Sequence, residues 1–228
     1  MTDPKEVVRA GYDAIAQRIS EWKVPGVPRR RLVAQLLDLL PPAGADVLEL
    51  GCGEGLPAAR MLAERHAYTG VDISPVQVER AHRNVPGATF VEADYTRLEL
   101  PPESFDAVVA ILTITHVPRE EHAELLSSIF RWLRPGGYFL ASFGAGDLAS
   151  DVDEDWLGAP MFFSHFDAET NRRLLRDAGF ELLVDEVVAQ DEGEHGIARF
   201  LWVIAQTPSS PRRPGPGGSH PGQSVTRM

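Results

Sequence analysis

The chain has 228 residues, of which 43% are hydrophobic, a content that suffices for one α/β domain and a tail but not for two substantial domains. Its formal net charge of −11 repels phosphate backbones, which disfavours nucleic acid as a substrate. The single cysteine, Cys52, excludes an intrachain disulfide and a cysteine-based zinc site.

Two stretches near the N-terminus have the apolar spacing of amphipathic helices. The first covers residues 4–21 and the second residues 31–40. A Pro- and Gly-containing segment over 24–28 separates them, and Pro41 ends the second. We expect residues 1–45 to form a helical cap that precedes the core.

A glycine-rich turn follows the first predicted strand, residues 47–50. Gly51, Gly53 and Gly55 lack a Cβ, so their backbone can adopt positive φ and approach a ligand at the start of the next helix. The spacing is G-x-G-x-G, and Leu56 occupies the last glycine position of the dinucleotide fingerprint. The pattern predicts a nucleotide site and disfavours NAD or FAD.

An acidic residue ends each of the next two predicted strands. Asp72 closes the strand over 68–72, about 20 residues beyond the glycines, where a carboxylate can accept hydrogen bonds from both ribose hydroxyls. Asp94 follows the strand over 88–93 and can accept from an adenine amino group. Further strands are predicted over 105–113 and 138–143.

Five motifs occur in a fixed order along the chain. They are E-L-G-C-G-E-G at 49–55, G-V-D at 70–72, E-A-D at 92–94, F-D-A-V-V at 105–109 and L-R-P-G-G at 133–137. This set resembles the class I S-adenosylmethionine-dependent methyltransferases, particularly the small-molecule enzymes of the ubiquinone and menaquinone biosynthesis group. The resemblance covers about residues 12–206. It implies a Rossmann-like α/β fold with a seven-stranded mixed sheet in the order 3-2-1-4-5-7-6, the last strand antiparallel, and helices on both faces.

The resemblance also implies a set of contacts with the cofactor S-adenosylmethionine. Gly51 and Gly53 approach its methionine and ribose portions, Asp72 binds the ribose, and Asp94 addresses the adenine. Packing on the core is the alternative role for the aromatic residue at position 12. The full predicted set is Tyr12, Glu49, Gly51, Gly53, Asp72, Ile73, Ala93, Asp94, Tyr95 and Ile111.

The core is expected over residues 46–207, interrupted by a lid insertion over 144–166. This segment lacks strong periodicity, and long loops in compact domains are often lids. It contains Trp156 and the run Met161–Phe163, which as a group favour an aromatic or hydrophobic acceptor. The alternative is that these side chains only anchor the loop to the core.

Two histidines are candidates for a catalytic base. A base is needed only if the acceptor must lose a proton, and an imidazole titrates near neutrality. His116 lies just past the fourth predicted strand, and His165 lies in the lid insertion. Packing or hydrogen bonding is the alternative role of each. No metal site is predicted, because the acids near position 150 lack the ordered spacing of a cation loop.

The last 21 residues, 208–228, include thirteen that are Pro, Gly or Ser, which predicts a disordered tail. No apolar stretch reaches the roughly 20 residues that span a bilayer, and the first residues are too charged for a signal peptide. We therefore expect a cytoplasmic protein with a small-molecule acceptor and neither a nucleic-acid nor a membrane partner. Its oligomeric state is left open.

The function predicted from these features is methyl transfer from S-adenosylmethionine to a small aromatic or hydrophobic acceptor. Three alternatives stay open. The chain can bind the same cofactor and catalyse a non-methylating reaction, since folds are reused in this way. It can be a noncatalytic partner subunit, or a nicotinamide oxidoreductase, which Leu56 and Asp94 disfavour. Neither the acceptor nor its methylated atom follows from the sequence.

Overall fold

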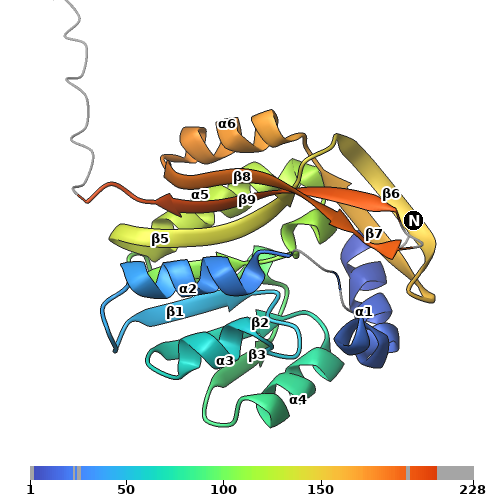
Figure 1. The fold of residues 1–228 in the computed structure, drawn as a ribbon, viewed down its shortest axis with the longest axis horizontal. Coiled ribbons are helices and arrows are strands. Elements are labelled where there is room, and N and C mark those ends of the chain that lie inside the picture. Colours follow the sequence, from blue (N-terminus) through green and yellow to red (C-terminus); the bar gives the residue numbers. More distant parts are fainter. Residues whose placement is uncertain (1–2, 23, 25–26, 194–195, 210–228) are drawn as a thin grey trace, which may run out of the picture.

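The computed structural model describes residues 3–22, 24, 27–193 and 196–209. Its centre is a seven-stranded sheet, drawn in Figure 1, in which neighbouring strands follow the order β3 (Thr89–Glu92), β2 (Ala67–Asp72), β1 (Asp46–Leu50), β4 (Phe105–Ala110), β5 (Leu133–Gly144), β9 (Ile197–Gln206) and β8 (Glu181–Asp191). Counted within the sheet this is the order 3-2-1-4-5-7-6, and β9 is antiparallel to both of its neighbours. The fold predicted from the sequence is confirmed.

Helices cover both faces of this sheet (Figure 1). One face carries α2 (Arg29–Leu39), α3 (Ala58–Ala63) and α4 (Pro75–Asn84), whose buried side chains share one apolar cluster with the strands. The other face carries α5 (His122–Trp132) and α6 (Ala168–Ala178). Short 3₁₀ turns lie at Tyr95–Arg97, Ile114–His116 and Arg119–Glu121.

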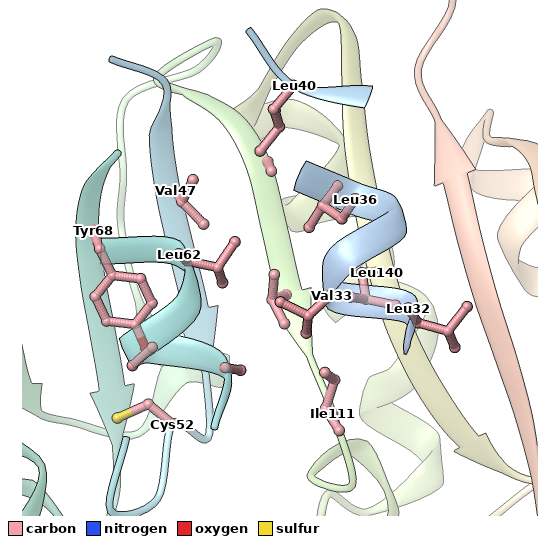
Figure 2. Packing of buried hydrophobic residues seen from close by; sticks show 14 of the residues in the cluster. Leu32, Val33, Leu36, Leu40, Val47, Cys52, Leu62, Tyr68, Ile111 and Leu140 are labelled. Carbon is pink, nitrogen blue, oxygen red and sulfur yellow. The ribbon is translucent and has the colours of Figure 1, made fainter. Parts of the chain in front are cut away.

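The strands at the centre are buried on both faces, as in other sheets covered by helices. Along β4, Ala107 and Val109 belong to the cluster under α2 and α3, while Val108 and Ala110 belong to the opposite cluster. Figure 2 shows Leu32, Val33 and Leu36 of α2 packed toward the strands on the first face. This core fixes the positions of the strand ends.

The two N-terminal helices occupy different places. Helix α2 packs on the sheet, whereas α1 (Pro4–Glu21) packs against a small separate sheet, beside which it is drawn in Figure 1. Asp3 caps α1, because its side chain accepts a hydrogen bond from the Lys5 N–H at 3.0 Å. The predicted helical cap over residues 1–45 thus consists of two helices, one packed on the central sheet and one packed on the small sheet.

The segment 144–166, expected to be irregular, contains an antiparallel hairpin of β6 (Leu148–Trp156) and β7 (Ala159–His165). Strand β6 is exposed and acidic along most of its length, so it lacks the alternating apolar pattern that marks a strand in sequence. Met161 and Phe162 of β7 are buried against α1. A Cβ on Gly11 of α1 would lie 2.6 Å from the Pro160 carbonyl oxygen, so the helix and hairpin are in close contact there.

The fourth strand is shorter than the sequence predicts. It ends at Ala110 and not at residue 113, and Leu112 has a φ of 53° at the turn that follows. The predicted disordered tail lies outside the described residues from position 210 onward. Among the helices that are described, none combines the length and apolar character needed to cross a membrane.

The apolar face of α2 generates a stability prediction. Leu36 is fully buried between α2 and the sheet, while Leu39 on the same helix is 39% exposed. We expect Leu36→Ala to lower the free energy of unfolding by about 2–5 kcal/mol, because it removes buried methyl groups and leaves a cavity. Urea denaturation measures the change. Leu39→Ala is the matched control, and equal losses in the two variants would contradict the packing described here.

Candidate functional site

A cavity of about 1060 Å³ lies at the carboxyl ends of the central strands, where ligands bind in open α/β sheets. Its wall is completed by α1, the β6–β7 hairpin and the end of the β8–β9 hairpin. Most of the predicted site residues line this one cavity: Tyr12, Glu49, Gly51, Gly53, Asp72, Ile73, Asp94, Tyr95, Ile111, His116 and His165. Ala93 does not line it, and its backbone N–H donates to the Asp72 carbonyl at 3.0 Å.

The glycine turn shapes the floor of the cavity through two different constraints. Gly51 has a φ of +65°, and a Cβ there would lie 2.1 Å from the Thr113 hydroxyl oxygen. Gly53 has a φ of +54°, and a Cβ there would meet no heavy atom of the described residues within 4 Å. Gly51 therefore permits close packing of two turns, while Gly53 leaves its backbone open to a ligand.

Asp72 is held at the end of β2 by backbone donors. Its Oδ2 accepts from the Gly53 N–H at 2.8 Å, and its Oδ1 accepts from the Ser74 N–H at 2.9 Å. Burial raises the pKa of the carboxyl to about 6, and these two hydrogen bonds oppose the shift. Each carboxylate oxygen keeps a second lone pair, so the group can still accept from a ligand.

Glu49 forms a second buried acidic centre in the same wall. Its Oε2 accepts a hydrogen bond from the Tyr68 hydroxyl at 2.5 Å, and burial raises the pKa of the carboxyl to about 7. The nearby Arg29 guanidinium opposes this shift. The Nε of Arg29 is buried and has no hydrogen-bond partner among the described residues.

Arg29 is a cavity residue that sequence reasoning missed. It is the first of three consecutive arginines at the start of α2. The run itself is the only signal in the sequence, and it does not distinguish Arg29, which is half-buried, from Arg30 and Arg31, whose side chains are exposed.

The Asp94 end of the cavity is tied to α1. Asp94 Oδ1 accepts from the Thr96 N–H at 2.9 Å and from the Thr96 hydroxyl at 2.8 Å, while its Oδ2 lies 3.3 Å from the Lys5 ammonium nitrogen. Lys5 also donates to Glu121 at 2.5 Å. The Tyr95 hydroxyl donates to the Thr113 carbonyl at 3.1 Å. A lysine of the first helix thus reaches the carboxylate that we expect to contact the adenine.

His116 is buried, and both of its ring nitrogens are engaged. Its Nδ1 lies 2.8 Å from the Phe162 carbonyl oxygen, which can only accept, so Nδ1 carries the proton. In the neutral ring Nε2 is then the acceptor, and the Tyr12 hydroxyl donates to it at 2.9 Å. Burial lowers the pKa of His116 to about 4. The ring is neutral at pH 7, and a ligand could exchange protons with it only through Tyr12 or by displacing Tyr12.

His165 has a different arrangement of its ring nitrogens. Its Nδ1 lies 2.6 Å from the Gly146 carbonyl oxygen and therefore carries the proton in the neutral ring. In the described part of the chain Nε2 makes no hydrogen bond, so its lone pair is available. The ring lies over β5, where a Cβ on Gly144 would come within 2.3 Å of it.

An aromatic wall lies between α1 and the β6–β7 hairpin. Its ring centroids are 6.1 Å apart for Tyr12 and Trp156, 5.6 Å for Trp156 and Phe163, and 5.0 Å for Phe163 and His116. Trp22 packs on Trp156 at 5.6 Å. These rings give one side of the cavity an apolar surface. No group of three or more potential metal ligands occurs within the described residues.

Comparisons with known proteins agree with this geometry. Residues 47–137 match a family model described as a methyltransferase domain. The chain is 33% identical over 140 residues to a probable S-adenosylmethionine-dependent methyltransferase of Mycolicibacterium smegmatis, covering 61% of this chain and 53% of that protein. It is 39% identical over 115 residues to the 27-O-demethylrifamycin SV methyltransferase of Amycolatopsis mediterranei, covering 47% and 42%. The chain thus spans about half the length of these curated relatives.

The fold is also found in solved structures. That of the 1,6-didemethyltoxoflavin-N1-methyltransferase of Burkholderia thailandensis superposes with a TM-score of 0.68 at 22% identity, covering 91% of this chain and 92% of that one. It was solved with 1,6-didemethyltoxoflavin and S-adenosylhomocysteine bound. At this identity the likeness describes the fold.

The buried carboxyl of Glu49 generates a pH prediction. Its pKa is raised in the folded state, so its contribution to stability is complete below about pH 4.5 and is lost as the pH rises through about 7. We expect Glu49→Gln to remove a decline in unfolding free energy of about 3 kcal/mol across this range. Urea denaturation at several pH values measures it. Glu99→Gln, an exposed position, is the control; parallel profiles for the wild type and Glu49→Gln would refute the assignment.

Proposed function

We propose that the chain transfers a methyl group from S-adenosylmethionine to a small aromatic or hydrophobic organic acceptor. The match of residues 47–137 to a methyltransferase-domain model and the likeness to curated methyltransferases support this proposal. The observation that carries the proposal is the continuity of the cavity. One space of about 1060 Å³ joins the glycine turn and Asp72 to the aromatic wall and His165. Cofactor and acceptor would therefore meet inside one enclosure.

The residues of the strand ends fit this cofactor. Gly53 leaves open space above its backbone, and Asp72 has free lone pairs for a ribose diol. The Arg29 guanidinium, whose buried Nε lacks a partner within the described part of the chain, suits the methionine carboxylate. Asp94 and Lys5 lie where the adenine is expected. The cofactor supplies an electrophilic methyl group on a sulfonium sulfur.

The remaining wall would bind and orient the acceptor. The rings of Tyr12, Trp156 and Phe163 provide an apolar surface that excludes water, and alignment of reacting groups supplies a large share of catalysis in favourable systems. If the acceptor must lose a proton, His165 can take it on Nε2. His116 would act as a positioning residue, because its Nε2 is already occupied by the Tyr12 hydroxyl.

The narrower resemblance to enzymes of ubiquinone and menaquinone biosynthesis remains part of the proposal. The aromatic wall supports a ring-containing acceptor of phenol or quinol type. Two of the three methyltransferases reported above have names that indicate the methylated atom, one an oxygen and one a nitrogen, and the proposal is consistent with either.

Cofactor binding is the first prediction of this proposal. Calorimetric titration should give micromolar affinity for S-adenosylmethionine and S-adenosylhomocysteine and no binding of NAD. Asp72→Ala should weaken binding of both sulfur compounds by about ten- to a hundredfold, because it removes hydrogen bonds to a charged group. Asp38→Ala, an exposed change on α2, is the control and should bind normally. Absence of binding to the wild-type chain would refute the proposed activity.

Product analysis is the second prediction. Incubation with S-adenosylmethionine and a panel of phenols and quinols should yield S-adenosylhomocysteine together with a methylated acceptor. With a hydroxyl acceptor, His165→Asn should lower kcat by about 10²–10⁴-fold, because it removes the proton acceptor at Nε2. His116→Asn should mainly raise KM, because it releases Tyr12. Conversion of an acceptor without S-adenosylhomocysteine would instead support the non-methylating alternative.

A further inference from the structure

An unpaired amide lies in the wall of the cavity at the far end of β8. Gln190 is 1% exposed and lines the cavity, and its side-chain Nε2 is buried. This nitrogen has no hydrogen-bond partner anywhere in the described chain. Buried polar groups in folded proteins are nearly always paired, so an orphaned donor in a cavity wall calls for an explanation.

The position of Gln190 in its strand is one that an apolar side chain would suit. On the same face of β8, Val184 and Val188 pack against the apolar cluster under α2. Gln190 is two residues beyond Val188 on the same face of β8, the edge strand of the sheet, and it pairs with Ala198 of β9. An apolar side chain would extend the core without leaving a donor unsatisfied. The amide is therefore costly to the ligand-free protein.

The surroundings of Gln190 belong to the acceptor side of the cavity. Phe200 of β9 lines the cavity and pairs with Gly144 of β5, over which the His165 ring lies. Gly144 and Phe200 are on strands next to each other, and Gln190 is on the following strand. Gln190 thus lies on the side of the cavity away from Asp72, at the end of β2, and Asp94, just after β3, because β2 and β3 are on the other side of β1.

We infer that Gln190 selects the acceptor by donating a hydrogen bond to a carbonyl or hydroxyl oxygen on an otherwise apolar ring system. This inference rests on the proposed function, since it concerns the second substrate of the same cavity. The terminal torsion of a glutamine side chain is broad, so rotation of the amide is enough to turn its N–H groups toward a ligand. An acceptor without such an oxygen leaves the donor unpaired and is bound less well.

The first test measures the ligand-free protein. Gln190→Met keeps the length of the side chain and removes the amide, and we expect it to raise Tm by roughly 2–6 °C because an unpaired buried donor is lost. Gln206→Met is the matched control. Gln206 is on β9 in the same hairpin, and its amide donates to the Gly136 carbonyl at 2.9 Å. That change should lower Tm or leave it unchanged.

The second test measures recognition with two probes that differ by one carbonyl, 1-tetralone and tetralin. Each is titrated into protein saturated with S-adenosylhomocysteine, and tryptophan fluorescence reports binding near Trp156. The ratio of Kd for tetralin to Kd for 1-tetralone should fall about tenfold in Gln190→Met relative to the wild type. It should not change in Gln206→Met. The two probes differ in hydrophobicity, but this difference affects the Kd ratio equally in the wild type and in the variants, so it cancels when the ratios are compared.

The outcomes separate this inference from the proposed function. If S-adenosylhomocysteine fails to bind the wild type in calorimetry, the proposed function falls and the inference falls with it. If it binds but the probe ratio is the same in Gln190→Met and the wild type, or neither probe binds, only the inference is overturned. A loss of Tm in Gln190→Met as large as that in Gln206→Met, or larger, would show a structural role for the amide and would also overturn it.

Discussion

The hydrogen bond from the Gly53 N–H to the Asp72 carboxylate, 2.8 Å long, joins the ends of β1 and β2 where the cavity begins. It depends on a turn whose residues adopt positive φ and also pack closely against neighbouring side chains. A Cβ on Gly51 would collide with Thr113. A Cβ on Gly70 of β2 would lie 2.8–2.9 Å from Phe90 and Cys52. Because the strand ends approach so closely at these glycines, the backbone donors and the carboxylate form a rigid floor, against which every other wall of the cavity is placed.

The rest of the enclosure comes from elements outside the central sheet. Helix α1 and the β6–β7 hairpin share an apolar cluster that contains Ile15 and Met161. Polar contacts attach this pair to the floor, since the Ser74 hydroxyl donates to Asp13 at 2.6 Å and Lys5 reaches Asp94. The sheet thus supplies the half of the cavity proposed for the cofactor, while the added elements and the β8–β9 hairpin supply the half proposed for the acceptor. Differences in these added elements would reshape the half proposed for the acceptor and leave the floor unchanged.

Several buried polar groups in this cavity reduce the stability of the ligand-free chain. Burial raises the pKa of both Glu49 and Asp72, and Arg29 and Gln190 each bury a nitrogen without a partner within the described residues. Side chains of this kind are unfavourable unless a ligand completes their hydrogen bonds. Their concentration around one space is expected of a binding site, where stability is commonly sacrificed for function.

The sequence by itself determined the features whose signals are local. The glycine turn and the positions of Asp72 and Asp94 after predicted strands are each encoded within a few neighbouring residues, and the family resemblance then implied the strand order. Only the tertiary structure decided the pairing of Tyr12 with His116, which are 104 positions apart, and the availability of His165 Nε2. It also decided the hairpin over 148–165, because the exposed β6 carries no apolar alternation. The roles of Arg29 and Gln190 depend on burial and missing partners, which are properties of the packed chain and leave no pattern in the order of its residues.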